Sequence, residues 1–398
     1  MRTTGPWLRA AAGAMLLGPD GAPAPTVFAE MSALAAATGA INLGQGFPDE
    51  DGPAEVIEAA VEAVRAGANQ YPPGRGTPDL RAAIAEHQAR FYGIALDLDR
   101  EVLVTAGATE ALAASLLALV DSGDEVVTFE PFYDAYGALI RLAGGTHVPV
   151  PLVAPGFLPD ESALRAAVND RTRVILVNSP HNPTGRVLPR EVLATIVELA
   201  ERHDAIIVTD EVYEHLTFDV AHVPIATLPG AASRTLTISS AGKTFSTTGW
   251  KIGWVTGPAE LVDAVLTVKQ FLTFTNGAPF QPAVATGLRL PDAVFTATAE
   301  SLRHRRDVLA AGLTAAGFGV SLPDATYFVV ADAAGLGHDD ARALCLDLPR
   351  LAGVVGVPVS AFVRPEHADG YRSLVRFAFC KRLEVLEEAT AGLQALAH

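Results

Sequence analysis

Lys243 is the residue whose type and surroundings point most clearly to covalent chemistry. It lies in the small, hydroxyl-rich run Ser239-Ser240-Ala241-Gly242-Lys243-Thr244, directly after an apolar stretch typical of a buried strand. Burial lowers the pKa of a lysine amine and makes it a nucleophile that can form a Schiff base. For a lysine considered alone, a solvated surface position is the commoner alternative.

Two nucleotide-binding motifs are excluded by spacing. A Walker loop needs a glycine five positions before Gly242, where this chain has Thr237. The glycine-containing runs that begin at Gly44 and Gly107 lack the GxGxxG spacing of dinucleotide-binding proteins. The lysine turn is therefore not explained by nucleotide binding through either motif.

Polar residues after two other predicted strands could act on the same ligand. Asp210 directly follows the apolar run 205–209, and a carboxylate there needs a cation, such as a pyridinium nitrogen, or hydrogen bonds. Tyr213 could place its phenol beside the same ring, and Asn182 lies in a rigid turn that presents its amide. The alternatives are a helix cap for Asp210 and a turn former for Asn182. His181 is predicted to be a solvated loop residue.

A phosphate site is predicted at Thr105-Ala106-Gly107-Ala108-Thr109, a run that opens a helix after another strand. Free N–H groups at a helix N-terminus bind phosphate. A phosphate cup, a ring acid, a phenol, an amide and a Schiff-base lysine are the groups that bind pyridoxal phosphate. We therefore expect this cofactor at the strand ends, and no metal.

Seven apolar runs bounded by turn residues predict the buried strands that position these groups: 101–105, 125–129, 147–152, 173–178, 205–209, 235–239 and 252–256. Helix-length segments with apolar residues at threes and fours lie between several of them, such as 110–120 and 190–202. This alternation predicts an α/β fold with a mostly parallel seven-stranded sheet between helices. Ligands of such sheets bind beyond the carboxyl ends of the strands.

The pattern changes after Pro291 to a basic helix over 301–313 and short strands around 327–330 and 374–379, which indicates a smaller α+β domain. We expect an N-terminal arm with part of the small domain at 1–50, a large cofactor-binding domain at 51–290, and a small C-terminal domain at 291–398.

Composition limits the partners. The 398 residues carry a formal net charge of −16, which argues against nucleic acid and anionic membranes, and no apolar run reaches the roughly 18–20 residues of a spanning helix. Two cysteines form no disulfide framework, which favours a cytoplasmic protein. The stretch 10–17 resembles an export signal only weakly, so we expect an arm that docks on the body.

Several motifs in combination resemble the fold-type I, class I and II aminotransferases, from about Thr26 to the C-terminal helix. They are Asn42-Leu43-Gly44-Gln45-Gly46-Phe47-Pro48-Asp49, Gln70-Tyr71-Pro72-Pro73-Gly74, Asn182-Pro183-Thr184-Gly185, Asp210-Glu211-Val212-Tyr213, Gly242-Lys243-Thr244-Phe245, Gly249-Trp250-Lys251-Ile252-Gly253 and Val375-Arg376-Phe377. The chain is most similar to the kynurenine, glutamine and methionine transaminase group. The runs 46–53 and 179–185 resemble in particular the N-succinyldiaminopimelate aminotransferase branch.

The resemblance implies a role for each candidate residue. Lys243 would hold pyridoxal phosphate and move a proton between the substrate's Cα and the cofactor, while Asp210 would keep the ring nitrogen protonated. Tyr213 and Asn182 would hydrogen-bond the ring oxygen. The other implied contacts are ring stacking by Tyr133, phosphate binding by Gly107, Ala108, Thr109, Ser240, Lys251 and Tyr71 of the neighbouring subunit in a homodimer, and substrate binding by Arg376, Asn182 and the Gly46 backbone.

One position departs from many relatives, which carry arginine where Lys251 stands, so a compact charge would replace a planar fork at the phosphate. The resemblance implies amino transfer from an L-amino acid to a 2-oxo acid, with N-succinyl-LL-diaminopimelate and 2-oxoglutarate favoured. Kynurenine, glutamine or methionine as donor is the close alternative, and a carbon–sulfur β-lyase is a further one. A DNA-binding regulator is disfavoured, because only about 25 residues precede the match and the charge is acidic.

Overall fold

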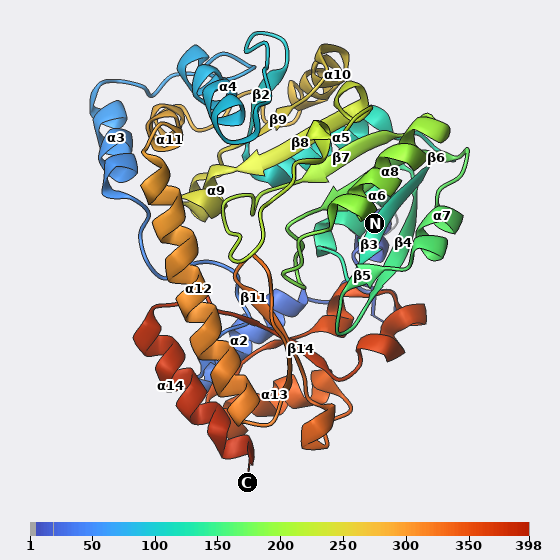
Figure 1. The fold of residues 1–398 in the computed structure, drawn as a ribbon, viewed down its shortest axis with the longest axis vertical. Helices are drawn as coiled ribbons and strands as arrows, with labels where there is room; N and C mark the ends of the chain where they lie inside the picture. Colours follow the sequence, from blue (N-terminus) through green and yellow to red (C-terminus); the bar gives the residue numbers. More distant parts are fainter. Residues whose placement is uncertain (1–4, 19, 398) are drawn as a thin grey trace.

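A computed structural model describes residues 5–18 and 20–397 of the chain. Its central sheet has eight strands and forms the upper part of the molecule in Figure 1. In spatial order the strands are β2 (Val102–Thr105), β9 (Gly253–Thr256), β8 (Thr235–Ser240), β7 (Ile206–Asp210), β6 (Thr172–Asn178), β3 (Glu125–Glu130), β4 (Thr146–Val153) and β5 (Leu158–Pro159).

The sheet is mostly parallel, as predicted. The strands β8, β7, β6, β3 and β4 pair in parallel, whereas β9 is antiparallel to its two neighbours β2 and β8, and β5 is antiparallel to β4. The seven predicted runs all form strands, with ends within one residue of the prediction. The eighth strand, β5, was not predicted, because two residues that hairpin onto an edge carry no apolar run.

Helices cover both faces of this sheet. One core cluster contains apolar side chains of α5 (Gly107–Leu119), α6 (Asp134–Ala143) and α10 (Ala259–Lys269). A second core cluster contains those of α7 (Glu161–Ala167) and α8 (Arg190–Arg202). A further cluster at the β2 edge holds α3 (Ala54–Arg65), α4 (Pro78–Tyr92) and α11 (Phe280–Leu288).

Local sequence explains where these helices begin and end. The Thr77 hydroxyl caps α4 by accepting from the Leu80 amide, Pro78 occupies the first turn, and Gly93 ends the helix with a left-handed φ of 69°. Helix α8 spans the predicted range 190–202 and buries one face.

The lower part of the molecule contains an antiparallel sheet of β10 (Gly319–Ser321), β11 (Phe328–Asp332), β14 (Leu374–Ala378) and β13 (Val357–Pro358). A parallel pair lies beside it, formed by β1 (Ile41–Asn42) and β12 (Val354–Val355). The helices here are α2 (Val27–Thr38), α13 (Ala341–Ala352) and α14 (Leu383–Leu393). The N-terminal strand β1 thus pairs with the C-terminal strand β12. The expected domain boundaries stay a prediction.

Helix α12 (Asp292–Ala315) runs from the upper part of the molecule to the lower part (Figure 1). The prediction of a helix over 301–313 was nine residues late at its start. The helix begins directly after Pro291, because proline lacks an N–H and is well suited to a position where no intrahelical bond is needed.

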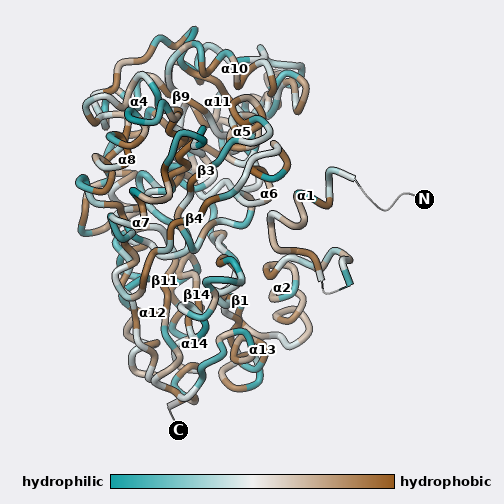
Figure 2. Tube along the Cα trace, turned by 90° about the vertical axis from the view of Figure 1, so that its right-hand side faces the viewer, coloured by the Kyte–Doolittle hydropathy of each residue, from teal (hydrophilic) through white to brown (hydrophobic). Residues whose placement is uncertain are grey.

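The N-terminal arm docks on the body, as expected. Helix α1 (Pro6–Gly13) packs against α6, and the two lie side by side in Figure 2. Among residues 5–18 and 20–397, no helix combines the length and the apolarity needed to cross a membrane.

Candidate active site

The carboxyl ends of five strands surround one cavity of about 220 Å³ in the upper part of the molecule. Its volume lies below the roughly 300–1,000 Å³ of sites for drug-sized ligands, so it suits a compact ring better than a dinucleotide. Ten of the thirteen predicted site residues line it: Gly107, Ala108, Thr109, Tyr133, Asn182, Asp210, Tyr213, Ser240, Lys243 and Lys251.

Lys243 lies in the short helix α9 (Ala241–Thr244), which begins directly after β8. The Ser240 hydroxyl caps this helix by accepting from the Gly242 amide at 3.2 Å. The Lys243 Nζ donates to the Tyr327 hydroxyl at 2.7 Å, and that hydroxyl donates to the Gly46 carbonyl at 2.6 Å. Burial lowers the pKa of Lys243 to about 8, so a useful share of the amine is neutral near pH 7.

Asp210 is the last residue of β7, and its side chain is buried. Its Oδ2 accepts from the Tyr136 hydroxyl at 2.7 Å. Burial raises the pKa of Asp210 to about 6 and outweighs the hydrogen bond from Tyr136 and the charge of Lys243, which favour the carboxylate. A cationic ring nitrogen bound beside it would shift the balance back to the charged form.

The turn after β6 carries Asn182. Its backbone amide donates to the Asn178 Oδ1 at 2.8 Å, and the Asn178 amide donates to the Asp210 carbonyl at 2.8 Å. This turn is thereby fixed to the strand end that carries the acid. His181 is buried here, not solvated as predicted, because it packs inside the turn with its Nδ1 at 2.8 Å from the Thr184 hydroxyl.

Arg376 lies in β14, in the lower part of the molecule, and is hydrogen-bonded to Asn182, which lines the cavity. Its Nη1 donates to the Asn182 Oδ1 at 3.2 Å, and its Nη2 donates to the Gly44 carbonyl at 2.7 Å. The guanidinium carbon lies 4.1 Å from the centre of the Phe328 ring, and the buried Nε has no partner. Burial lowers the pKa of Arg376 to about 10. An unpaired buried donor on a buried cation fits a carboxylate ligand.

The N-terminus of α5 forms the other end of the cavity. Gly107 has a φ of 73°, and a Cβ added there would lie 3.4 Å from the Lys251 Nζ. The ammonium group therefore sits against the positive end of the helix, whose preceding residue Ala106 supplies no side-chain cap. Two positive features so close together favour a bound anion, and phosphate suits free helix N–H groups.

Lys251 itself has a left-handed φ of 55°, which non-glycine residues adopt at a cost in free energy and which recurs at functional sites. Tyr133 follows β3 and lies edge-on to Tyr136, with ring centres 5.7 Å apart. Burial raises the pKa of Tyr133 to about 12, so its phenol stays neutral.

Gly46, Tyr71 and Arg376 do not line the cavity. A Cβ at Gly46 would lie 2.4 Å from the Phe328 ring, so only glycine brings its carbonyl this close to Tyr327. Tyr71 is 83% exposed and packs edge-on against Phe274, with ring centres 5.6 Å apart. Within one chain it contributes nothing to the cavity.

Three residues of the site were missed from sequence. Asn178 ends β6 and could have been found by the strand-end argument that identified Asp210. Tyr136 lies in the first turn of α6, three residues after Tyr133, a spacing that places both on one side of the chain. Tyr327 comes from the lower part of the molecule, and no local pattern signals its contact with Lys243.

The donor set as a whole fits pyridoxal phosphate. It offers a neutral-capable amine, a buried acid for a cationic nitrogen, phenol and amide groups for the ring oxygen, and a positive pocket for the phosphate. Asp210 and Lys243 line the same cavity and therefore can contact one planar ligand.

The model of the family "Aminotransferase class I and II" matches residues 38–391. A Mycobacterium tuberculosis protein, described as a probable N-succinyldiaminopimelate aminotransferase, is 54% identical over 94% of this chain and 96% of its own length. Methionine aminotransferase of Escherichia coli is 38% identical over 93% and 96%. The solved structure of N-succinyldiaminopimelate aminotransferase from M. tuberculosis has a TM-score of 0.91, covering 94% of this chain and 97% of that one.

Proposed function

The chain belongs to the class I and II aminotransferases, and on that premise we propose that it is a pyridoxal-phosphate enzyme whose amino-transfer chemistry is centred on Lys243. The observation that carries the proposal is a lysine whose pKa burial lowers to about 8, in the same cavity as a buried carboxyl. A structural lysine would have no need of either feature.

When bound, pyridoxal phosphate supplies an electron-withdrawing ring that accepts the electron pair released at the substrate's Cα. Lys243 would hold the cofactor and, once displaced by the substrate's amine, carry the proton that leaves Cα. Its contact with the Tyr327 hydroxyl holds the free amine in place between the two proton transfers. Asp210, oriented by Tyr136, keeps the ring nitrogen protonated.

Arg376 would bind the α-carboxylate of the substrate, since its Nε is a buried donor without a partner. Asn182 links this guanidinium to the cavity and so sets where the Cα of the substrate lies relative to Lys243. The N-terminus of α5, with Ser240 and Lys251, would hold the phosphate.

For the substrates, we propose N-succinyl-LL-diaminopimelate as amino donor and 2-oxoglutarate as acceptor. The support is the 54% identity to the M. tuberculosis protein described with that activity, against 38% for a methionine aminotransferase and 35% for a human kynurenine–oxoglutarate transaminase. Kynurenine, glutamine or methionine stays the alternative donor. A carbon–sulfur β-lyase would use the same residues.

A half-reaction panel tests the substrate proposal. Each candidate donor is mixed with the loaded enzyme, and the rate at which the visible absorption is lost is compared between donors. N-succinyl-LL-diaminopimelate should react fastest by kcat/KM, and a faster reaction with kynurenine or methionine would reject it. Pyruvate and ammonia released from a cysteine conjugate would instead identify a lyase.

We further propose a homodimer in which Tyr71 of each subunit reaches the phosphate of the other. Support comes from four exposed apolar side chains close in sequence or space, Tyr71, Phe271, Leu272 and Phe274. A cytoplasmic location is proposed on the basis of Cys345 and Cys380, two buried free thiols. The division into 1–50, 51–290 and 291–398 also stays a proposal.

A further inference from the structure

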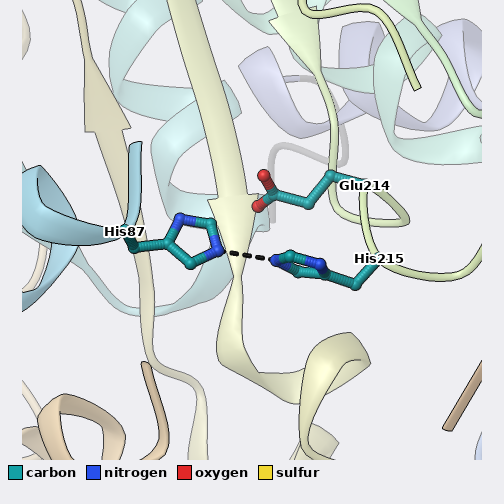
Figure 3. Close-up of side chains that lie close together, drawn as sticks. All are labelled: His87, Glu214 and His215. Carbon is teal, nitrogen blue, oxygen red and sulfur yellow. Dashed lines mark hydrogen bonds between the residues drawn. The ribbon is translucent and has the colours of Figure 1, made fainter. Parts of the chain in front are cut away.

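A cluster of two buried residues, His87 and Glu214, and the half-buried His215 lies outside the cavity described above. His87 comes from α4, whereas Glu214 and His215 follow Tyr213 in the turn after β7. The candidate ligand atoms of all three residues lie within 4.8 Å of one another. Figure 3 shows the two imidazoles pointing at each other with the carboxylate beside them.

We propose that His87, His215 and Glu214 bind one divalent transition-metal ion, Zn²⁺ in the first place, which joins α4 to the turn that carries the active-site residues. Two imidazoles and one carboxylate are a ligand set that zinc uses with a fourth position left for water. No spacing motif predicted this site, because Glu214 lies 127 positions after His87 in the sequence.

The two histidines present their ring nitrogens to one point. Each imidazole directs its Nε2 at the other ring, on the side where the Glu214 carboxylate lies. Their Nε2 atoms lie 2.6 Å apart. Two ligands of a tetrahedral zinc ion are ~3.3 Å apart, so the two Nε2 atoms need to separate by about 0.7 Å.

The charge of Glu214 is the second argument. This carboxyl is 4% exposed. The neighbouring charges are already paired: the Arg90 Nε donates to Asp292 at 2.7 Å, and the His222 Nε2 lies 2.8 Å from Glu211. The side-chain partner left to Glu214 is the Ser239 hydroxyl, so a charge on this buried carboxyl needs a cation.

Outer contacts of the cluster also resemble those of metal sites. The Ser239 hydroxyl donates to Glu214 Oε1. Hydrogen bonds of this kind orient a ligating carboxylate. Phe91 and Phe295 pack on His215, with ring centres 4.7 and 4.4 Å away, and restrict the ring to one orientation.

Equilibrium dialysis of the untagged, cofactor-loaded protein against Zn²⁺, followed by metal analysis, tests the proposal. We expect one zinc per chain, and in His87→Gln and His215→Gln a loss of affinity larger than the roughly 10–100-fold cost of losing an outer partner. The matched control is His304→Gln, which removes an exposed histidine and should bind zinc like the unchanged protein.

Two further measurements keep the test decisive if a histidine variant does not fold. Glu214→Gln keeps a side-chain oxygen that accepts from Ser239 and should still lose zinc. Co²⁺ added to the unchanged holoenzyme should give the visible difference spectrum of a four-coordinate nitrogen and oxygen site. Binding of less than one zinc per chain, equal binding by the variants, or a six-coordinate Co²⁺ spectrum would show that the two rings merely share a proton.

Discussion

Tyr136 orients Asp210, the proposed ring acid, and favours its charged form, because its hydroxyl donates to Asp210 Oδ2 at 2.7 Å. Tyr136→Phe keeps the ring packing and removes this bond. Hydrogen bonds to charged groups contribute about 1.5–3 kcal/mol, so we expect a roughly 10–100-fold loss in cofactor affinity or in kcat. Titration of the cofactor-free protein with pyridoxal phosphate and steady-state kinetics measure both.

Tyr371→Phe is the matched control. The hydroxyl of this buried tyrosine lies 2.8 Å from the Leu152 carbonyl and 3.1 Å from the Glu130 carbonyl, and Tyr371 does not line the cavity. The change should lower stability and leave cofactor affinity unaltered. Equal cofactor affinity of Tyr136→Phe and the unchanged protein would contradict the role given to Tyr136.

Asp210 should cost stability in the cofactor-free protein. Its pKa is raised from 3.8 to about 6, so between these values the folded chain binds more protons than the unfolded chain. Stability therefore falls as pH rises through this window, and above it the cost is up to about 3 kcal/mol. Asp210→Asn removes that cost, and we expect the variant to be more stable than the unchanged protein at about pH 7.5.

Urea unfolding of both cofactor-free proteins at about pH 7.5 and about pH 4 measures the effect. At the lower pH the carboxyl is protonated in the unchanged protein, so the two free energies of unfolding should converge. A stability difference that does not change between the two pH values would contradict the raised pKa. The pKa of Glu214 is also raised, but this residue is present in both proteins, so its contribution cancels in the difference between their free energies of unfolding.

At the scale of elements, α1 and α6 meet through two glycines. A Cβ at Gly137 would lie 2.2 Å from the Gly13 carbonyl oxygen. Gly137→Ala should therefore destabilise the full chain by about 1–3 kcal/mol, the usual range for overpacking. In a chain that lacks residues 1–25, the same change should stabilise by about 0.5–1 kcal/mol, because alanine is the better helix former.

Thermal or urea unfolding measures the effect in four proteins: the full chain and the chain without residues 1–25, each with Gly137 and with Gly137→Ala. The sign of the Gly137→Ala effect must reverse between the long and the short chain if α1 packs on α6. An effect of the same sign and size in both chains would mean that the arm does not rest there in solution.

Elements that are buried on both faces were the easiest to predict. The runs that became β6 and β7 are apolar because a central parallel strand has no solvent face, and the polar residue at each end marks the site. Asp210, Lys243 and the α5 N-terminus could be found for this reason. The contact of Tyr327 with Lys243 could not, since it depends on packing between distant segments. The start of α12 was missed for a local reason, because it is marked by Pro291 and not by the apolar pattern.

For the whole molecule, the central question is whether one chain completes its own site. Tyr71 is exposed and does not line the cavity of its own chain. Phe271, which belongs to the same set of exposed apolar side chains, is 86% exposed. If Tyr71 acts in the partner's site, a Tyr71→Ala and a Lys243→Ala protein should each be nearly inactive. Mixed under conditions that exchange subunits, they should regain activity, because one of the two hybrid sites then contains both residues.

Activity of the mixture should approach a quarter of the unchanged enzyme, since half of random dimers are hybrids with one intact site each. Activity that stays at the sum of the two variants would contradict a shared site. Size-exclusion chromatography of each variant verifies that both remain dimers.

The most direct measurement of the central claim is to find which lysine holds the cofactor. The sequence contains only four lysines: Lys243, Lys251, Lys269 and Lys381. Borohydride reduction of the loaded protein makes the attachment permanent, and peptide mass spectrometry locates it. We predict the added mass on Lys243 alone, and its loss together with transaminase activity in Lys243→Ala. Attachment at another lysine, or full activity of Lys243→Ala, would contradict the account.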